Sequence, residues 1–172
     1  MNTKKLTITA ILIAIGFILH SIVPPIGIIE MDFSLIFMVI AIFVNKDSLL
    51  SSTVVGVVTG LLTFISSKST IAIANIPDKV ITALFIYLIF KFVKDKKLNK
   101  LLMFTIFTLA TLVSGITFCL VGNIFADIPI LLMLFTGVLP ATVINGFSGI
   151  ILFNLIMKYL RREAYGDCKI QK

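Results

Sequence analysis

The residues in this sequence best suited to chemistry are an adjacent acid and base, Asp78 and Lys79, in the stretch NIPDK at positions 75–79. An uncharged apolar run follows them, from position 80 to position 90. A carboxylate and an ammonium beside such a run are costly to bury unless they are paired, hydrated or functional. The couple could bind a zwitterion, with Asp78 taking an ammonium group and Lys79 a carboxylate.

The same stretch also fits a purely structural role. Asn75 could cap a helix, Pro77 could occupy its first turn, and Asp78 could complement the helix dipole. Lys79 could then reach the lipid headgroups with its long side chain. The residue types alone leave both interpretations open.

Two more polar residues interrupt apolar runs. His20 stands shortly before the pair of prolines that begins at Pro24, and it could hydrogen-bond a ligand or the backbone of a loop. Asn145 lies in the run that follows Pro140, where a buried amide must find partners. It could face a ligand pocket or bond a neighbouring helix.

Signals for enzymatic chemistry or metal binding are weak. The sequence has one histidine, which excludes most two-histidine metal sites. It has no P-loop, so the chain is not expected to hydrolyse ATP itself. Cys119 lies in an apolar run and Cys168 in a polar tail, so both are expected to be free thiols. We therefore predict a protein that is not an enzyme and has no metal or cofactor of its own.

The composition indicates which solvent surrounds these residues. Of the 172 residues, 59% are hydrophobic and 13% are charged, and the mean hydropathy is +1.14. Soluble domains have about 25% charged residues. A chain this apolar cannot cover a globule with polar surface, so lipid must be its solvent. The length predicts one transmembrane domain spanning residues 1–172.

Uncharged runs predict an all-α membrane protein with six transmembrane helices. The second and fourth of these runs are too short to cross the membrane by themselves. They can cross it only if polar residues at their ends lie near the interface, or if other parts of the protein shield one end. Residues 128–138 contain Pro129 and precede Pro140, which predicts either a short external segment or part of a kinked helix. The predicted helices cover about 5–23, 32–46, 48–66, 76–94, 101–126 and 139–161.

The basic residues indicate the orientation. If the N-terminus is cytoplasmic, 13 of the 15 lysines and arginines fall on the cytoplasmic side, and only Lys68 and Lys79 fall outside. This asymmetry is typical of the positive-inside rule and predicts that both termini are cytoplasmic. The net charge of +7 then reflects topology and contact with anionic membrane lipid, and no nucleic-acid partner is expected.

Small residues recur at helical spacing in several runs. Gly56 and Gly60 share one face of the third helix, as Gly146 and Gly149 do on the sixth, and such pairs typically allow helices to pack closely. In the first helix Ala10 and Ala14 form a similar flat strip. An outward-facing strip would offer a docking surface for another membrane protein.

These features together resemble a known class of membrane proteins. A small chain with six short-looped helices, a cytoplasmic N-terminus and an Ala-x-x-x-Ala strip resembles the substrate-binding S component of energy-coupling factor (ECF) transporters. More narrowly, it resembles the bacterial tryptophan-transport protein family. The pieces that carry this resemblance are HSIVPP at 20–25, GVVTG at 56–60, NIPDK at 75–79, VSG at 113–115, and LPA at 139–141 with Asn145.

The resemblance implies an ECF S-component-like bundle in the bacterial cell membrane that captures tryptophan from outside. It implies docking through Ala10 and Ala14 onto a transmembrane coupling subunit served by two ATPase subunits, which would use the ATP. It also favours Asn75, Asp78 and Lys79 as ligand contacts, with His20 and Asn145 as further candidates.

Two alternatives remain open at this stage. The same fold could carry a vitamin such as riboflavin, biotin or pantothenate. The chain could instead be a membrane assembly or regulatory subunit without a ligand, in which case Asp78 and Lys79 only pair with each other or reach the interface.

Overall fold

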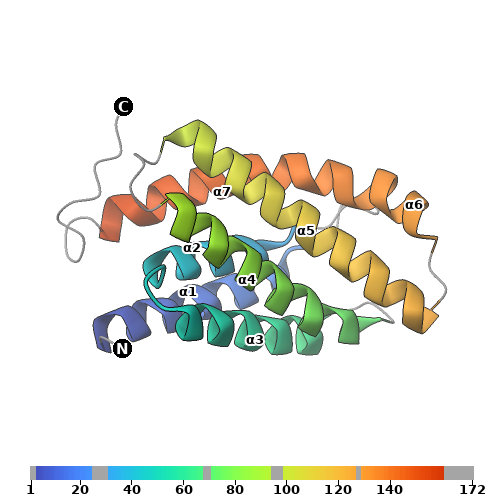
Figure 1. Cartoon of the computed structure of the whole chain (residues 1–172), viewed down its shortest axis with the longest axis horizontal. Helices are drawn as coiled ribbons and strands as arrows, with labels where there is room; N and C mark the ends of the chain where they lie inside the picture. Colours follow the sequence, from blue (N-terminus) through green and yellow to red (C-terminus); the bar gives the residue numbers. More distant parts are fainter. Residues whose placement is uncertain (1–2, 25–30, 68–70, 94–98, 127–128, 161–172) are drawn as a thin grey trace.

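The computed structural model describes residues 3–24, 31–67, 71–93, 99–126 and 129–160. Within these ranges the chain is helical and contains no strand, which confirms the predicted all-α class. Figure 1 shows an elongated bundle in which the start of the first helix and the end of the last lie at the same end. The elements in order are α1 (Thr3–Ile22), α2 (Phe33–Val44), α3 (Leu49–Ser66), η1 (Ala72–Ala74), α4 (Asn75–Val93), α5 (Lys100–Ala126), α6 (Ile130–Met133), η2 (Leu134–Val138) and α7 (Leu139–Leu160).

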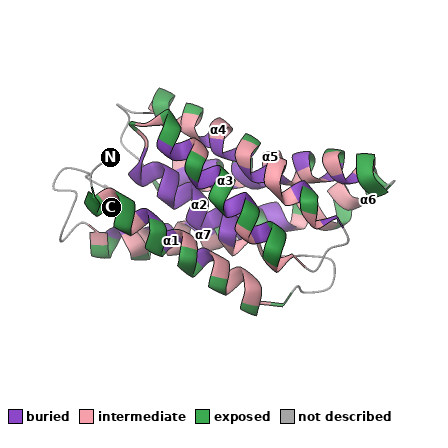
Figure 2. Cartoon of the chain, turned by 90° about the horizontal axis from the view of Figure 1, so that it is seen from below, coloured by how far each residue is buried: buried purple, intermediate pink, exposed green. Residues whose placement is uncertain are grey.

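Several helices have the length and composition of membrane spans. In the described part of the chain these are α1, α3, α5 and the continuous helical stretch Ile130–Leu160. Their outer faces carry exposed apolar side chains such as Ile11, Leu50, Ile124 and Ile151, and Figure 2 shows exposed residues along the outside of the bundle. So much exposed apolar surface would be unfavourable in water and is expected where lipid surrounds a protein.

The short second helix lies in the centre of the bundle. Every residue of α2 from Ser34 to Val44 is buried, and Figure 2 shows α2 as a buried rod among the others. Its 12 residues rise only about 18 Å. The surrounding helices therefore shield it from lipid, which explains how so short a helix fits within the membrane bundle.

Hydrogen bonds at both ends of α2 fix its position. At the start, the Asp32 carboxylate accepts from the backbone N–H of Leu35 at 2.9 Å, a typical N-cap. At the end, the side-chain amide of Asn45 donates to the Thr9 hydroxyl of α1 at 2.6 Å and to the Ala41 carbonyl at 2.8 Å. The N-cap matters for function because it places a carboxylate at the end of the bundle where α6 lies.

Glycines bring α3 and α4 into close contact. A Cβ atom added to Gly56 would lie 2.6 Å from the Cβ of Ala83, and one added to Gly60 would lie 3.1 Å from the Cα of Ile76. Larger side chains at these positions would separate the two helices. The close approach positions the first turns of α4, which carry Asp78 and Lys79, against the centre of the bundle.

The last helical stretch is continuous from α6 to α7. Two interpretations of residues 128–138 were open, and over 130–138 the structure has a helix that joins α7 through the π-helical turn η2. Pro140 lacks an N–H and lies two residues after the end of η2, so the wider turn accommodates the missing hydrogen bond. Residues 127 and 128 lie outside the described ranges.

Candidate functional site

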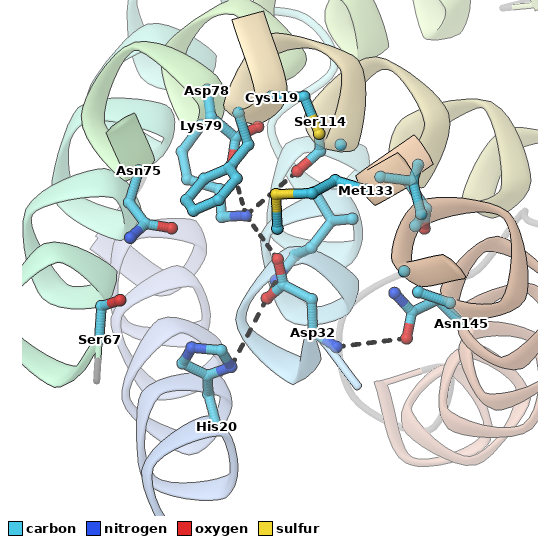
Figure 3. Close-up of a pocket in the computed structure, with 17 residues that line it drawn as sticks. His20, Asp32, Ser67, Asn75, Asp78, Lys79, Ser114, Cys119, Met133 and Asn145 are labelled. Carbon is cyan, nitrogen blue, oxygen red and sulfur yellow. Dashed lines mark hydrogen bonds and ion pairs between the residues drawn. The ribbon is translucent and has the colours of Figure 1, made fainter. Parts of the chain in front are cut away.

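A cavity of about 170 Å³ lies where α2 and α4 begin and α1 and α3 end. These ends face the exterior if the N-terminus is cytoplasmic. Figure 3 shows polar side chains from several helices converging on this space. Its lining consists of His20, Asp32, Leu35, Ser67, Asn75, Asp78, Lys79, Thr111, Ser114, Gly115, Phe118, Cys119, Met133, Gly137, Val138, Ala141 and Asn145.

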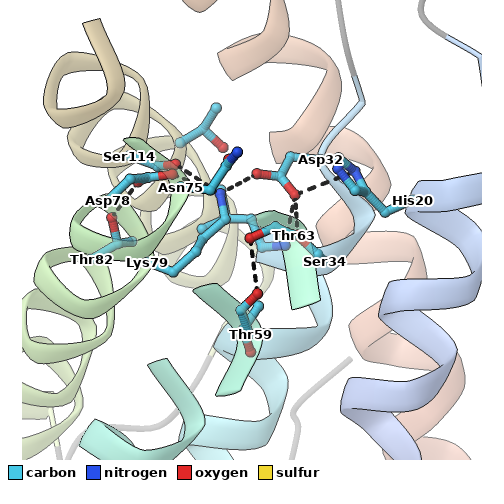
Figure 4. A network of polar contacts seen from close by, with 12 residues as sticks. His20, Asp32, Ser34, Thr59, Thr63, Asn75, Asp78, Lys79, Thr82 and Ser114 are labelled. Carbon is cyan, nitrogen blue, oxygen red and sulfur yellow. Dashed lines mark hydrogen bonds and ion pairs between the residues drawn. The ribbon is translucent and has the colours of Figure 1, made fainter. Parts of the chain in front are cut away.

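The centre of the site is a buried lysine held by two carboxylates. The Lys79 ammonium donates to Asp32, to Asp78 at 2.9 Å and to the Ser114 hydroxyl at 3.2 Å. An ammonium group has three hydrogens to donate, so these bonds use all of them. The side chains of Lys79 and Asp78 are each only 2% exposed. Figure 4 shows this network joining α2, α4 and α5.

Asp32 is the more accessible of the two carboxylates. Its side chain is 20% exposed and accepts from the Ser34 hydroxyl at 2.6 Å, the Leu35 N–H at 2.9 Å and Lys79. A carboxylate has about four acceptor positions, so these three bonds leave capacity for another donor. Asp32 lies directly before α2 and outside that helix. Burial alone would raise the pKa of Asp32, but the charges of Lys79 and His20 hold this pKa below its ordinary value.

The charges in the cluster do not balance. Asp32 and Asp78 together carry two negative charges when ionised, against one positive charge on Lys79. The imidazole Nδ1 of His20 lies 3.8 Å from the Asp32 carboxylate and adds a positive charge only when protonated. A buried cluster with excess negative charge favours a cation that can enter from the cavity.

Asn145 contributes a hydrogen-bond donor to the same cavity. Its side-chain oxygen accepts from the backbone N–H of Asp32 at 3.3 Å, which orients the amide (Figure 3). The residue is 1% exposed, and among the described residues its Nδ2 has no hydrogen-bond partner. A buried N–H without a partner is unfavourable, so a ligand acceptor at this point would satisfy it.

Apolar side chains form the remaining wall. Phe118 of α5, Met133 of α6 and Val138 of η2 line the cavity. Val138 packs so closely on α5 that a Cβ added to Gly115 would lie 2.4 Å from its Cγ1. The site thus combines a charged, hydrogen-bonding side with an aromatic and sulfur-containing side that suits an apolar ring.

The structure brings the five predicted binding residues together in this cavity: His20, Asn75, Asp78, Lys79 and Asn145 all line it. Lys79 does not extend to the surface, in contrast to the structural role considered for it, because its ammonium is bound inside the bundle. Asp78 is buried as well, and it also accepts from the Thr82 hydroxyl at 3.3 Å.

Ala10 and Ala14 lie elsewhere. Both are exposed on α1 and line an apolar groove of about 400 Å³ that α1 forms with α3. Other walls of this groove come from Leu50, Val54 and Val58. The predicted strip therefore faces outward, as a docking surface requires.

Sequence reasoning missed Asp32 as a site residue. The only available signal was a carboxylate directly before the most apolar run of the chain, two positions after Glu30, which we interpreted as the polar end of a short helix. Its partner Lys79 is 47 positions away, and sequence spacing does not predict that they meet. Ser114 was missed for the same reason.

The site has no arrangement typical of a metal centre. Among the described residues, no group of three or more histidine, cysteine or acidic side chains could hold a metal ion. Cys119 is a buried free cysteine beside the cavity. Cys168 lies outside the described residues.

Known proteins match this chain over nearly its whole length. The family model described as "Tryptophan transporter TrpP" matches residues 2–161. A "Probable tryptophan transport protein" of Clostridium perfringens is 34% identical, covering 95% of this chain and 96% of the relative. The protein of the same description from Bacillus subtilis is 35% identical, covering 96% and 97%. That from Clostridium acetobutylicum is 34% identical, covering 94% and 96%.

No solved structure gives a significant match to the chain. The family match confirms the resemblance indicated by the sequence motifs. Together with the long apolar helices, it also confirms the predicted location in a membrane. The chain is a multi-pass bacterial membrane protein and belongs to the tryptophan transporter TrpP family.

Proposed function

We propose that this protein is the substrate-binding membrane subunit for tryptophan uptake and that the cavity holds the amino acid. The main support is that one cavity holds a partly accessible carboxylate, Asp32, and a buried amide donor, Asn145, that has no hydrogen-bond partner among the residues the structure describes. Membership of the family, whose relatives are described as probable tryptophan transport proteins, supports the choice of substrate.

In this proposal the substrate ammonium binds Asp32. With both carboxylates ionised and His20 neutral, the cluster carries one excess negative charge, which attracts a cation. Asp32 is more exposed than Asp78 and has acceptor capacity left. Lys79 then stabilises the two carboxylates, and does not bind the substrate carboxylate, because its three hydrogens are already donated.

The substrate carboxylate is proposed to accept from the Nδ2 of Asn145. Asn145 and Asp32 are joined by a hydrogen bond of 3.3 Å, so both ends of a zwitterion would be bound side by side. The aromatic ring would then extend toward Phe118 and Met133, since these supply the apolar wall. Ring–aromatic and sulfur–aromatic contacts favour an indole there.

Calorimetric titration of the purified protein tests this function. We expect saturable binding of tryptophan, and native mass spectrometry of mildly purified protein should detect the retained amino acid. The chain has no tryptophan of its own, so indole emission in the sample would come from the ligand. No response to any aromatic amino acid would reject the proposal.

A panel of other ligands separates the alternative functions. A response to riboflavin, biotin or pantothenate but not to tryptophan would favour a vitamin carrier. No response to any small molecule would favour a membrane assembly or regulatory subunit.

We further propose that uptake depends on an ECF coupling subunit and two ATPase subunits. The support is the exposed apolar groove at Ala10 and Ala14, whose small side chains allow close approach of another helix. The chain has no P-loop, so ATP hydrolysis would take place in the ATPase subunits.

The partnership is tested by co-purification of this chain with the coupling and ATPase subunits. Ala14→Phe fills the groove and should abolish co-purification while tryptophan binding persists. Ile11→Phe is a matched control, because Ile11 is exposed on α1 outside the groove. Uptake that is unchanged in cells lacking these ATPases would reject the partnership.

A further inference from the structure

Asn75 is held so that its side-chain oxygen, and not its nitrogen, is available in the cavity. The Nδ2 of Asn75 donates to the backbone carbonyl of Ala72 at 2.9 Å. A carbonyl only accepts, so this bond fixes which way the amide is turned. Among the described residues no donor reaches the Oδ1 of Asn75, and the residue lines the cavity. Figure 3 shows this oxygen on the side of the amide that faces Lys79.

The two asparagines of the site therefore offer opposite groups. Asn145 presents a donor, since its oxygen is used by Asp32. Asn75 presents an acceptor, since its nitrogen is used by Ala72. In Figure 3 they lie on opposite sides of the cavity with Asp32 between them. This order of acceptor, carboxylate and donor suits a ligand with an N–H at one end and an amino-acid group at the other.

We infer that the Oδ1 of Asn75 accepts the indole N–H of the substrate and thereby determines specificity for the indole ring. The inference rests on the proposed function and deepens it by naming the atom that distinguishes tryptophan from other aromatic amino acids. Asn75 is partly buried in the free protein, and a bound ring would cover it further. Phenylalanine has no ring N–H, so it would leave this covered acceptor unpaired. A site built to bind a ligand N–H discriminates strongly against analogues that lack it.

The test compares tryptophan with β-(3-benzothienyl)-L-alanine, in which sulfur replaces the indole N–H while the ring shape is kept. Calorimetry on the unmodified protein should give an affinity for tryptophan at least about tenfold higher. Equal affinities for the two ligands would overturn the inference without affecting the proposed function. Absence of tryptophan binding would instead reject the proposed function itself.

Variants then identify the acceptor. Asn75→Ala should weaken tryptophan binding and leave binding of the benzothienyl analogue nearly unchanged, so the ratio of affinities falls toward one. Asn75→Asp keeps an acceptor oxygen, and this variant should retain discrimination. Ser67→Ala is the matched control, because Ser67 lines the same cavity with another oxygen. Loss of discrimination in Ser67→Ala, or its persistence in Asn75→Ala, would contradict the assignment.

The comparison of tryptophan with the benzothienyl analogue can be made on the unmodified protein and on Ser67→Ala even if Asn75→Ala does not fold. If that variant fails to fold, full discrimination in both Ser67→Ala and Asn75→Asp still supports Asn75. Loss of discrimination in Asn75→Asp, with tryptophan still bound, overturns the inference.

Discussion

The carboxylate of Asp32 and the ammonium of Lys79 form a partly buried ion pair between the start of α2 and the first turns of α4, although 47 positions separate them. The pair links the helix at the centre of the bundle to the helix that carries the NIPDK stretch. It also leaves the Asp32 carboxylate at the cavity surface, where a cationic group can reach it. The same contact therefore serves both folding and binding.

Lys79 is predicted to be essential for stability. Lys79→Met leaves the buried Asp78 and the partly buried Asp32 without a countercharge. Loss of one partner of a buried pair such as Lys79–Asp78 costs about 3–5 kcal/mol. We expect a clearly lower melting temperature in detergent and little folded protein. Lys79→Met combined with Asp78→Asn removes one of the negative charges and should recover part of the loss. If the protein with Lys79→Met alone were as stable as the unmodified protein, the cluster would not stabilise the fold.

Asn145 is predicted to bind the substrate carboxylate. Asn145→Ala should weaken tryptophan binding by tenfold or more, about 1.4 kcal/mol. Tryptamine has no carboxylate, so its affinity should change much less than that of tryptophan. Calorimetry with both ligands on both proteins measures the difference. Equal losses for the two ligands would mean that Asn145 acts only through the backbone of Asp32.

Gly56 is predicted to be required for the contact between α3 and α4. Gly56→Val would place side-chain atoms against Ala83 of α4, and such overpacking costs about 1–3 kcal/mol. The melting temperature should fall, and tryptophan affinity should fall with it because α4 positions the site. Val57→Leu provides the comparison, since Val57 is exposed and this change should have little effect on either quantity.

Much of the fold could be predicted because lipid imposes simple constraints. Uninterrupted apolar runs are needed to cross a membrane, and the distribution of lysine and arginine indicates orientation. The glycine pair at positions 56 and 60 indicated a close helix contact, and both glycines face α4. The central position of α2 was not predicted, because nothing in an apolar sequence distinguishes a face toward lipid from a face toward protein.

The site could be predicted only in part. A polar residue inside an apolar run is conspicuous, which is why Asn75, Asp78, Lys79 and Asn145 were recognised as candidates. Asp32 was not, because a carboxylate next to a helix end is ordinary at a membrane interface. Its role depends on the depth at which α2 lies, and that depth is determined by packing of the surrounding helices.

The most direct test of the central claim is a titration of tryptophan into Asp32→Asn. This change keeps the shape of the side chain and removes its charge. Asp47→Asn is the matched control, because Asp47 pairs with Lys5 at the opposite end of the bundle. We predict that Asp32→Asn lowers tryptophan affinity by tenfold or more, while its affinity for indole-3-propionate, which has no ammonium, does not fall. Unchanged tryptophan affinity in a folded Asp32→Asn protein would contradict the account.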